Sequence, residues 1–381
     1  MSNLTIAIIG ANGFIGGRLA EWLVLQNLAT VRPIVRSYKG LARLARFNLD
    51  FRISDATDSS MLEKQIKGCD VIFHCVVGDR NTILKSAEAI YKASSKANVK
   101  RMVYISTAVV HGLNPVPGTN DESDFWYRKP FSGYDYGVNK AKAENILRRL
   151  RQNGKVEIVT LRPFIVFGPR SQLWMAKIAT DMLSGEAYLI DKGEGICNTI
   201  YVDNLVYALW LAATVKEAAN QDFLITDGEK ITWKNLYTCV AEAVGVDIET
   251  IPSLDSSQLK GYMANINRMK KSLFKKQLVH AAKLIFPPDW IPVIRRVLPA
   301  SVIQKLERAG ISYEMQTTLN KSQDNSINLM PINMEITTLQ QCKYMLPIDK
   351  AKRVLGYTAQ VDFQLAAERT AEWLRFVMGL N

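Results

Sequence analysis

The first half of the chain alternates short apolar runs with longer segments in which apolar residues recur every three or four positions. Residues 4–9 (LTIAII) form one such run, and the segment RLAEWLVLQ that follows it has helical spacing. Further strand-like runs are TVRPIVRS, FRIS, DVIFHCVV (residues 70–77) and KRMVYIST. Strands that alternate with helices at this spacing predict an α/β fold with a Rossmann-type, doubly wound parallel sheet.

A glycine-rich turn joins the first predicted strand to the first predicted helix. Glycines let the backbone curl tightly there, and free N–H groups at the start of the helix favour a pyrophosphate. The strand before the turn and the helix after it favour a dinucleotide site over a plain turn. The residues expected to bind the cofactor here are Gly10, Asn12, Gly13, Phe14, Ile15 and Gly16.

The end of the second predicted strand bears on the choice of cofactor. An NAD site is expected to place a carboxylate there, to accept from the ribose 2′-hydroxyl. This chain has Val35 and Arg36 instead, with Lys39 close behind. A guanidinium suits a 2′-phosphate, so we expect NADP, with NAD as the alternative. Asp55, after the third predicted strand, is placed to contact adenine.

A hydroxyl, a phenol and an ammonium group are expected to meet near the nicotinamide. Thr107 ends the fifth predicted strand, and Tyr136 and Lys140 lie four residues apart, on one face of a predicted helix. A free tyrosine has a pKa near 10, and a nearby Lys⁺ and an oxidised nicotinamide would lower it. We therefore expect Tyr136 to act as acid/base while Thr107 holds the substrate oxygen.

Several stretches together resemble the extended short-chain dehydrogenases/reductases, the NAD-dependent epimerase/dehydratase family. The resemblance covers residues 4 to about 245 and returns near the C-terminus. It implies that Thr107, Tyr136 and Lys140 are catalytic, that Pro163 lies near the nicotinamide, and that substrate binds a smaller C-terminal domain. The matching stretches are GANGFIGGRL, VKRMVYISTAVVHG, YGVNKAKAE, LRPFIVFGP, IYVDNLVYAL, TDGEKITWKNLY and DKAKRVLGY.

Departures from the family's patterns narrow the expected chemistry. The dehydratases follow the catalytic Thr with Asp-Glu, whereas this chain has Ala108 and Val109, which cannot move a proton. The sugar-nucleotide epimerases use an Asn and an Arg to hold the diphosphate, at positions taken here by Ile165 and Cys197. We therefore expect an oxidoreductase acting on a ketone or secondary alcohol. An NDP-sugar epimerase or reductase is the alternative, and a non-catalytic nucleotide sensor is the third reading.

Composition sets the broad class of the protein. The 381 residues are 48% hydrophobic and 22% charged, an ordinary globular balance with no apolar run long enough to span a bilayer. The five cysteines are scattered and the three histidines are few, so we expect no disulfide framework and no metal centre. The N-terminus lacks the features of a secretion signal, and we expect a cytoplasmic protein.

The net charge of +12 is concentrated in a segment before the C-terminus. A block of this kind indicates an anionic partner, such as a phosphorylated substrate or a membrane surface, rather than nucleic acid. Its basic amphipathic stretches fit a lid, a solvated helix pair or a peripheral membrane contact. The basic residues between positions 260 and 310 are Lys260, Arg268, Lys270, Lys271, Lys275, Lys276, Lys283, Arg295, Arg296, Lys305 and Arg308.

We expect two coupled domains. Residues 1–170, with 196–218 returning, form the NADP-binding Rossmann domain. Residues 171–195 and 219–381 form a smaller α+β part that binds a small-molecule substrate and includes a basic insertion at about 255–345. A homodimer is compatible with this arrangement, although no motif specifies one.

Overall fold

The computed structural model describes residues 4–128, 135–152, 154–259 and 332–379. The described residues up to Ser253 and those from Ile332 onward form one compact unit. Leu254–Leu259 belong to a second unit, most of which lies outside the described residues. The basic segment predicted from the sequence falls in that gap, so its lid, helix-pair and membrane interpretations remain predictions.

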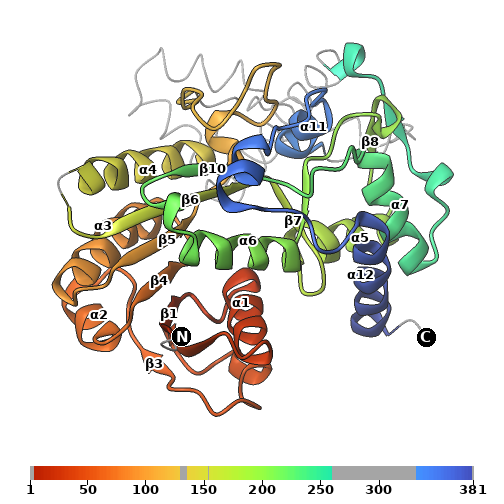
Figure 1. Cartoon of the computed structure of the whole chain (residues 1–381). Coiled ribbons are helices and arrows are strands. Elements are labelled where there is room, and N and C mark those ends of the chain that lie inside the picture. Colours follow the sequence, from red (N-terminus) through yellow and green to blue (C-terminus); the bar gives the residue numbers. More distant parts are fainter. Residues whose placement is uncertain (1–3, 129–134, 153, 260–331, 380–381) are drawn as a thin grey trace, which may run out of the picture. The chain divides into compact units, whose positions relative to one another are not determined.

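A sheet of seven parallel strands forms the centre of the first unit (Figure 1). The order is β10-β6-β5-β4-β1-β2-β3, and β1 lies between β2 and β4, so the strand order reverses at β1. Open α/β sheets bind ligands at such a reversal. The predicted fold class is confirmed, although β4 ends three residues before the expected Val77. The strands are β1 (Leu4–Ile9), β2 (Ala29–Val35), β3 (Arg52–Ile53), β4 (Val71–His74), β5 (Arg101–Ile105), β6 (Glu157–Pro163) and β10 (Asp222–Ile225).

Helices cover both faces of the sheet, because successive strand side chains point to opposite sides. In β1, Ile6 and Ile8 pack on one face, with apolar residues of α1 and α6. Ala7 and Ile9 pack on the other face, with α2, α3 and α4. A strand buried on both sides reads as a continuous apolar run, as LTIAII does. The helices are α1 (Phe14–Leu25), α2 (Ser59–Ile66), α3 (Arg80–Lys96), α4 (Tyr136–Gln152) and α6 (Val202–Thr214).

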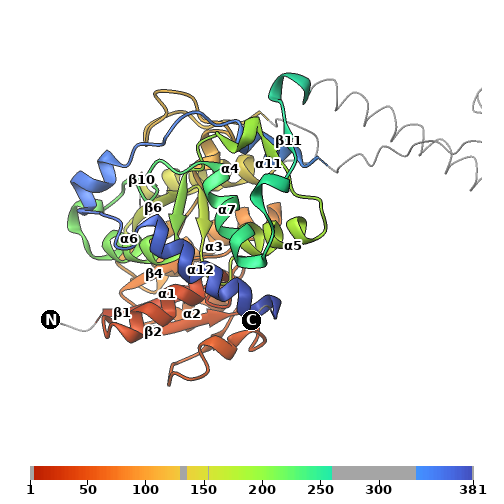
Figure 2. The same cartoon turned by 90° about the vertical axis from the view of Figure 1, so that its right-hand side faces the viewer.

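A third apolar cluster draws most of its residues from the later part of the chain. It includes the fully buried Trp233, whose Nε1 donates to the carbonyl of Leu339. The C-terminal helix α12 packs against α7 (Figure 2), while β7 pairs with β9. The elements are β7 (Ile165–Phe167), β8 (Leu189–Ile190), β9 (Thr199–Tyr201), β11 (Ser253–Leu254), α5 (Lys177–Leu183), α7 (Trp233–Val244), α11 (Met334–Gln340) and α12 (Phe363–Met378).

The state of the cysteines and the hydrophobicity of the helices were both considered in predicting a cytoplasmic location. All five cysteines are free, and Cys75 alone among them is partly exposed. Within the described ranges, no helix combines the length and hydrophobicity that a bilayer crossing requires. The cytoplasmic location stays a prediction.

Candidate active site

The glycine-rich turn leads from β1 into α1, and two of its glycines are required by close contacts. Gly10 has a φ of +94°, and a Cβ there would lie 2.8 Å from the Cys75 carbonyl oxygen. A Cβ on Gly16 would lie 2.5 Å from the Gly10 carbonyl oxygen. Gly13 precedes α1 without a side-chain cap, which leaves backbone donors at the helix start for an anion.

Asn12 connects this turn to the segment that follows β2. Its Nδ2 donates to the carbonyl oxygens of Ser37 at 3.0 Å and Lys39 at 2.8 Å. Arg36 lies in that segment with its side chain exposed. Asp55 is exposed beyond β3, and hydrogen bonds from the backbone and side chain of Thr57 lower its pKa. The two Asn12 bonds therefore hold the segment that carries Arg36, the residue expected to bind the 2′-phosphate, next to the glycine-rich turn.

A cavity of about 500 Å³ opens next to the glycine turn. It contains two arginines that sequence reasoning did not single out, Arg43 and Arg170. The Nε of Arg43 donates to Glu21 of α1 at 3.0 Å, so one of these guanidinium groups is already paired. The cavity is lined by Ala11, Asn12, Gly13, Phe14, Gly17, Gly40, Arg43, Leu44, Arg170, Gln172, Trp373, Phe376 and Val377.

Two hydroxyls follow β5, and the structure separates their roles. Ser106 is buried and its Oγ donates to Glu144 at 2.5 Å. The hydroxyl of Thr107 accepts from the backbone N–H of Val109 at 3.3 Å, which leaves its own proton free to donate elsewhere. The choice of Thr107 over Ser106 as the substrate-facing hydroxyl is consistent with this arrangement and stays a prediction.

Lys140 is buried inside α4, and its ammonium group is held from two sides. The Nζ donates to the Ile105 carbonyl at 2.9 Å and lies 4.8 Å from the centre of the Tyr104 ring. Burial lowers the pKa of Lys140 to about 8, and the negative charge of Glu144 limits the fall. The side chain is therefore still protonated at neutral pH.

Tyr136 is the first residue of α4 and stands one turn before Lys140, so the two share a helix face. Among the described residues, no hydrogen bond joins it to Thr107 or Lys140. Although 36% of Tyr136 is exposed, desolvation raises its pKa to about 12, and Glu335 of α11 adds to the rise. This direction is opposite to the lowering expected from Lys140. The protein's own groups favour the phenol, so any lowering would have to come from an oxidised nicotinamide.

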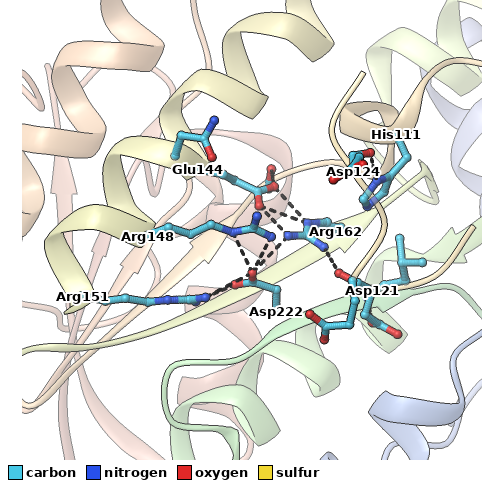
Figure 3. Close-up of polar contacts among 12 residues, drawn as sticks. His111, Asp121, Asp124, Glu144, Arg148, Arg151, Arg162 and Asp222 are labelled. Carbon is cyan, nitrogen blue, oxygen red and sulfur yellow. Dashed lines mark hydrogen bonds and ion pairs between the residues drawn. The ribbon is translucent and has the colours of Figure 1, made fainter. Parts of the chain in front are cut away.

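A buried ionic network connects α4 to β6 and to the segments around it (Figure 3). Arg162 is fully buried, directly before Pro163 at the end of β6. Its guanidinium contacts both oxygens of Glu144, the carbonyl oxygen of Asp121 at 2.8 Å, and Asp222 at 3.2 Å. Since Glu144 also accepts from Ser106, the network ties the ends of β5 and β6 to α4.

The acidic end of this network is strongly ionised. Burial alone would raise the pKa of Asp222, but Arg162, Arg151 and Arg148 outweigh it and lower the pKa to about 2. Arg148 and Arg151 reach Asp222 from α4 at 2.9 and 2.8 Å. The charges therefore stay paired over the whole physiological pH range.

The positions that depart from the family's phosphate-binding pattern are enclosed in the protein. Ile165 is 1% exposed and Cys197 is completely buried. Ala108 and Val109, which follow Thr107, are buried as well. None of these four side chains brings a charge to the site.

Sequence reasoning missed three groups near the site. Glu144 could have been found, because it stands one helical turn after Lys140 and therefore on the same face. Arg162 could have been suspected only as a charge inside an apolar strand. Glu335 gave no signal at all, because α11 lies about 200 residues from Tyr136 in the sequence.

Comparison with known proteins places the chain among nicotinamide-dependent enzymes. A family model described as the NAD dependent epimerase/dehydratase family matches residues 6–226. A 4-hydroxy-2-methyl-3-oxo-4-farnesyl-3,4-dihydroquinoline-1-oxide ketoreductase from Stigmatella aurantiaca is 24% identical, over 64% of this chain and 74% of the relative. A 2-alkyl-3-oxoalkanoate reductase from Shewanella oneidensis is 23% identical, over 63% of this chain and 66% of the relative.

Epimerases are similar at the same level. A UDP-glucose 4-epimerase from Vibrio cholerae is 26% identical, over 60% of this chain and 72% of the relative. The structure of a Thermotoga maritima UDP-glucose 4-epimerase with UDP-glucose is 20% identical, with a TM-score of 0.65 and coverage of 98% of this chain and 100% of that one. A Bacillus cereus UDP-glucuronic acid 4-epimerase in complex with NAD gives 16% identity, a TM-score of 0.65 and coverage of 98% and 99%. At these identities the structures establish the fold alone.

Proposed function

Because the chain belongs to the NAD dependent epimerase/dehydratase family, we propose that it is an NADP(H)-dependent oxidoreductase that interconverts a ketone and a secondary alcohol. The cofactor, when bound, supplies or accepts the hydride. Tyr136 gives its phenolic proton to the carbonyl oxygen during reduction and takes it back during oxidation. Thr107 donates a hydrogen bond to the same oxygen, and Lys140 places a positive charge beneath the phenol.

The observation that carries this proposal is the character of the cavity that adjoins Tyr136. Gly137 and Val138, the two residues after Tyr136, line a cavity of about 230 Å³. The described residues that line it include Val109, Leu113 and Trp126, and no lysine or arginine. An apolar cavity without a cation suits an uncharged ketone better than a diphosphate.

The raised pKa of Tyr136, about 12, favours the reducing direction. Reduction needs a phenol that is protonated before hydride transfer, whereas oxidation needs a phenolate. At neutral pH the phenol is the stable form in this protein. Reductases among the relatives, two of which are described above and have names that specify 3-oxo substrates, support the same direction.

An NDP-sugar epimerase is the second candidate, supported by the epimerases among the relatives. Against it stand the buried Ile165 and Cys197, at positions where the epimerases hold a diphosphate. Mass spectrometry of the purified protein separates the candidates. Tightly bound NAD⁺ would favour the epimerase, because it oxidises and re-reduces one substrate, while exchangeable NADPH would favour the reductase.

Replacing Tyr136 by Phe tests the proposed chemistry. With NADPH and a 2-alkyl-3-oxo ester as the probe, turnover should fall roughly 100-fold or more, while NADPH affinity should barely change. The matched control is Tyr134→Phe, two positions earlier, in a segment outside the described residues, and it should be mild. A Tyr136→Phe enzyme with wild-type turnover would refute the assignment.

A further inference from the structure

The cavity next to Tyr136 offers a ligand an almost entirely apolar, uncharged surface. Among the described residues that line it, none is an aspartate, glutamate, lysine or arginine. His111 is the one titratable residue of this wall, and burial, followed by the charge of Arg162, lowers its pKa, so the ring is neutral at pH 7. Its Nε2 has no hydrogen-bond partner in the described part of the protein and is itself buried, so it offers no polar contact to a ligand in the cavity.

The volume of the cavity limits what it can hold. It measures about 230 Å³. Pockets that take a whole drug-sized ligand measure about 300–1,000 Å³, so this cavity suits one part of a substrate. An apolar cavity of about 150 Å³ is large enough for a benzene molecule. The cavity therefore has room for a hydrocarbon group of phenyl size or somewhat larger.

Trp126 supplies the largest aromatic surface among the described residues of the wall. Gly112 lines the same cavity, and a Cβ there would lie 3.8–3.9 Å from three atoms of the Trp126 indole ring. The ring therefore lies against the glycine part of the wall, and 45% of Trp126 is still exposed. Val116, which also lines the cavity, is 66% exposed. The apolar surface thus continues from the cavity to its mouth.

The neighbours of Trp126 hold it in place. The Arg148 guanidinium lies 4.3 Å from the centre of the Phe125 ring, and the hydroxyl of Tyr127 accepts from Asn145. Both partners belong to α4, so the chain is fixed to this helix on each side of Trp126. Single exposed apolar side chains need no explanation, whereas a contiguous apolar surface joined to a cavity marks a binding site.

We propose that this cavity receives an uncharged apolar group of the substrate, of phenyl size or larger, and that Trp126 selects for that group. The proposal deepens the proposed function, and it rests on that function in taking the cavity as part of the same substrate site. It narrows the substrate class to ketones and alcohols that carry a bulky hydrocarbon substituent.

Three ketones that share one skeleton test the character of the cavity. 2-Butanone, 4-phenyl-2-butanone and 4-oxopentanoate differ only in whether hydrogen, phenyl or carboxylate stands at the end of the chain. Their affinities are measured by saturation-transfer NMR titration with NADP⁺, which cannot reduce a ketone. The wild-type protein should bind 4-phenyl-2-butanone about tenfold or more tighter than 2-butanone, because a buried phenyl ring leaves water. It should bind 4-oxopentanoate no tighter than 2-butanone.

Substitutions in the wall test the part that Trp126 takes. Trp126→Ala should lower the preference for the phenyl ketone about threefold or more, and Trp126→Phe, which keeps an aromatic ring, should restore part of it. Val116→Asp, a change at an exposed position that the fold should tolerate, should also lower the preference by placing a charge at the mouth. The control is Tyr127→Ala, because Tyr127 is exposed to a similar extent, 48%, and does not line the cavity.

Circular dichroism checks that each variant is folded. Equal affinities for the phenyl ketone and 2-butanone in the wild-type protein, or tighter binding of 4-oxopentanoate than of the phenyl ketone, would overturn the proposal. A preference that survives in both Trp126→Ala and Val116→Asp would do so as well. An equal fall in Tyr127→Ala would remove the assignment to Trp126, because the effect would then come from the segment as a whole.

The failure of this proposal is distinguishable from the failure of the proposed function. Tyr136→Phe should lose turnover and keep the preference for the phenyl ketone. A wild-type preference without any NADPH-dependent turnover would remove the oxidoreductase assignment and leave the role of the cavity intact. Turnover without the preference would do the reverse. In the active enzyme, Trp126→Ala should raise the KM for 4-phenyl-2-butanone more than the KM for 2-butanone.

Discussion

The glycine turn, on the proposed cofactor side, and the cavity beside Tyr136, on the proposed substrate side, are built in opposite ways. The turn is a run of seven residues whose shape follows from local backbone contacts, such as Gly16 against the Gly10 carbonyl. The cavity is assembled from segments more than 200 residues apart, and side-chain packing and ion pairs hold the elements that form it. Local backbone geometry therefore determines the shape of the proposed cofactor side, while tertiary packing determines the shape of the proposed substrate side.

The largest effect is expected where the substrate side depends on paired buried charges. Arg162→Met would leave Glu144 and Asp222 buried without their shared partner, which typically costs about 3–5 kcal/mol of unfolding free energy. Urea denaturation measures the loss. The control is Arg46→Met. The Arg46 side chain is 60% exposed, and its partner Glu21 keeps its ion pairs with Arg18 and Arg43, so the loss should be below about 1 kcal/mol. Similar small losses in both variants would show that the network is not a structural support.

On the proposed cofactor side, a steric clash rather than the loss of an ion pair should reduce stability and cofactor binding. Gly10→Ala places a Cβ against the Cys75 carbonyl and forces alanine into a positive φ, for which the backbone term alone costs roughly 1–2 kcal/mol. Gly40→Ala is the matched control, because Gly40 has a similar φ of +84° and no atom within 4 Å of its Cβ position. We expect Gly10→Ala to lose more stability and to weaken NADPH binding, measured by fluorescence titration. Equal losses of stability in Gly10→Ala and Gly40→Ala would mean that the positive φ alone, and not the contact with Cys75, causes the effect.

The same contrast explains what could be predicted from the sequence. The parallel sheet and its nucleotide turn were predictable, because apolar runs such as Leu4–Ile9 and the glycine spacing are local signals. The relation of Tyr136 to Lys140 was also local, being one helical turn. The direction of the Tyr136 pKa was not, because it depends on burial and on Glu335, which approaches only in the folded chain. The partnerless Nε2 of His111 likewise has no signature in the sequence.

A smaller effect should separate the two nicotinamide cofactors. Arg36 is exposed beside the turn, and a charge-assisted bond to a 2′-phosphate is worth about 1.5–3 kcal/mol. Arg36→Ala should therefore weaken NADPH by roughly 10- to 100-fold and leave NADH almost unchanged. The control is Arg46→Ala on the following segment, already paired with Glu21. Equal losses for both cofactors in Arg36→Ala would mean that this guanidinium does not read the phosphate.

The smallest expected effect concerns how much Glu335 of α11 changes the pKa of Tyr136. Desolvation is the main cause of the raised pKa of Tyr136, about 12, and the Glu335 carboxylate is the second. Removing that charge with Glu335→Gln should lower the pKa of Tyr136, because the phenolate no longer faces a like charge. The pH at which NADPH-dependent reduction declines should then fall, by less than about one unit, and oxidation should begin at lower pH. Glu368→Gln, which removes an exposed carboxylate from α12, should leave both profiles unchanged. An unchanged profile in Glu335→Gln would leave burial as the whole cause of the high pKa, and the contribution of α11 to the site would then be limited to the cavity wall at Thr338.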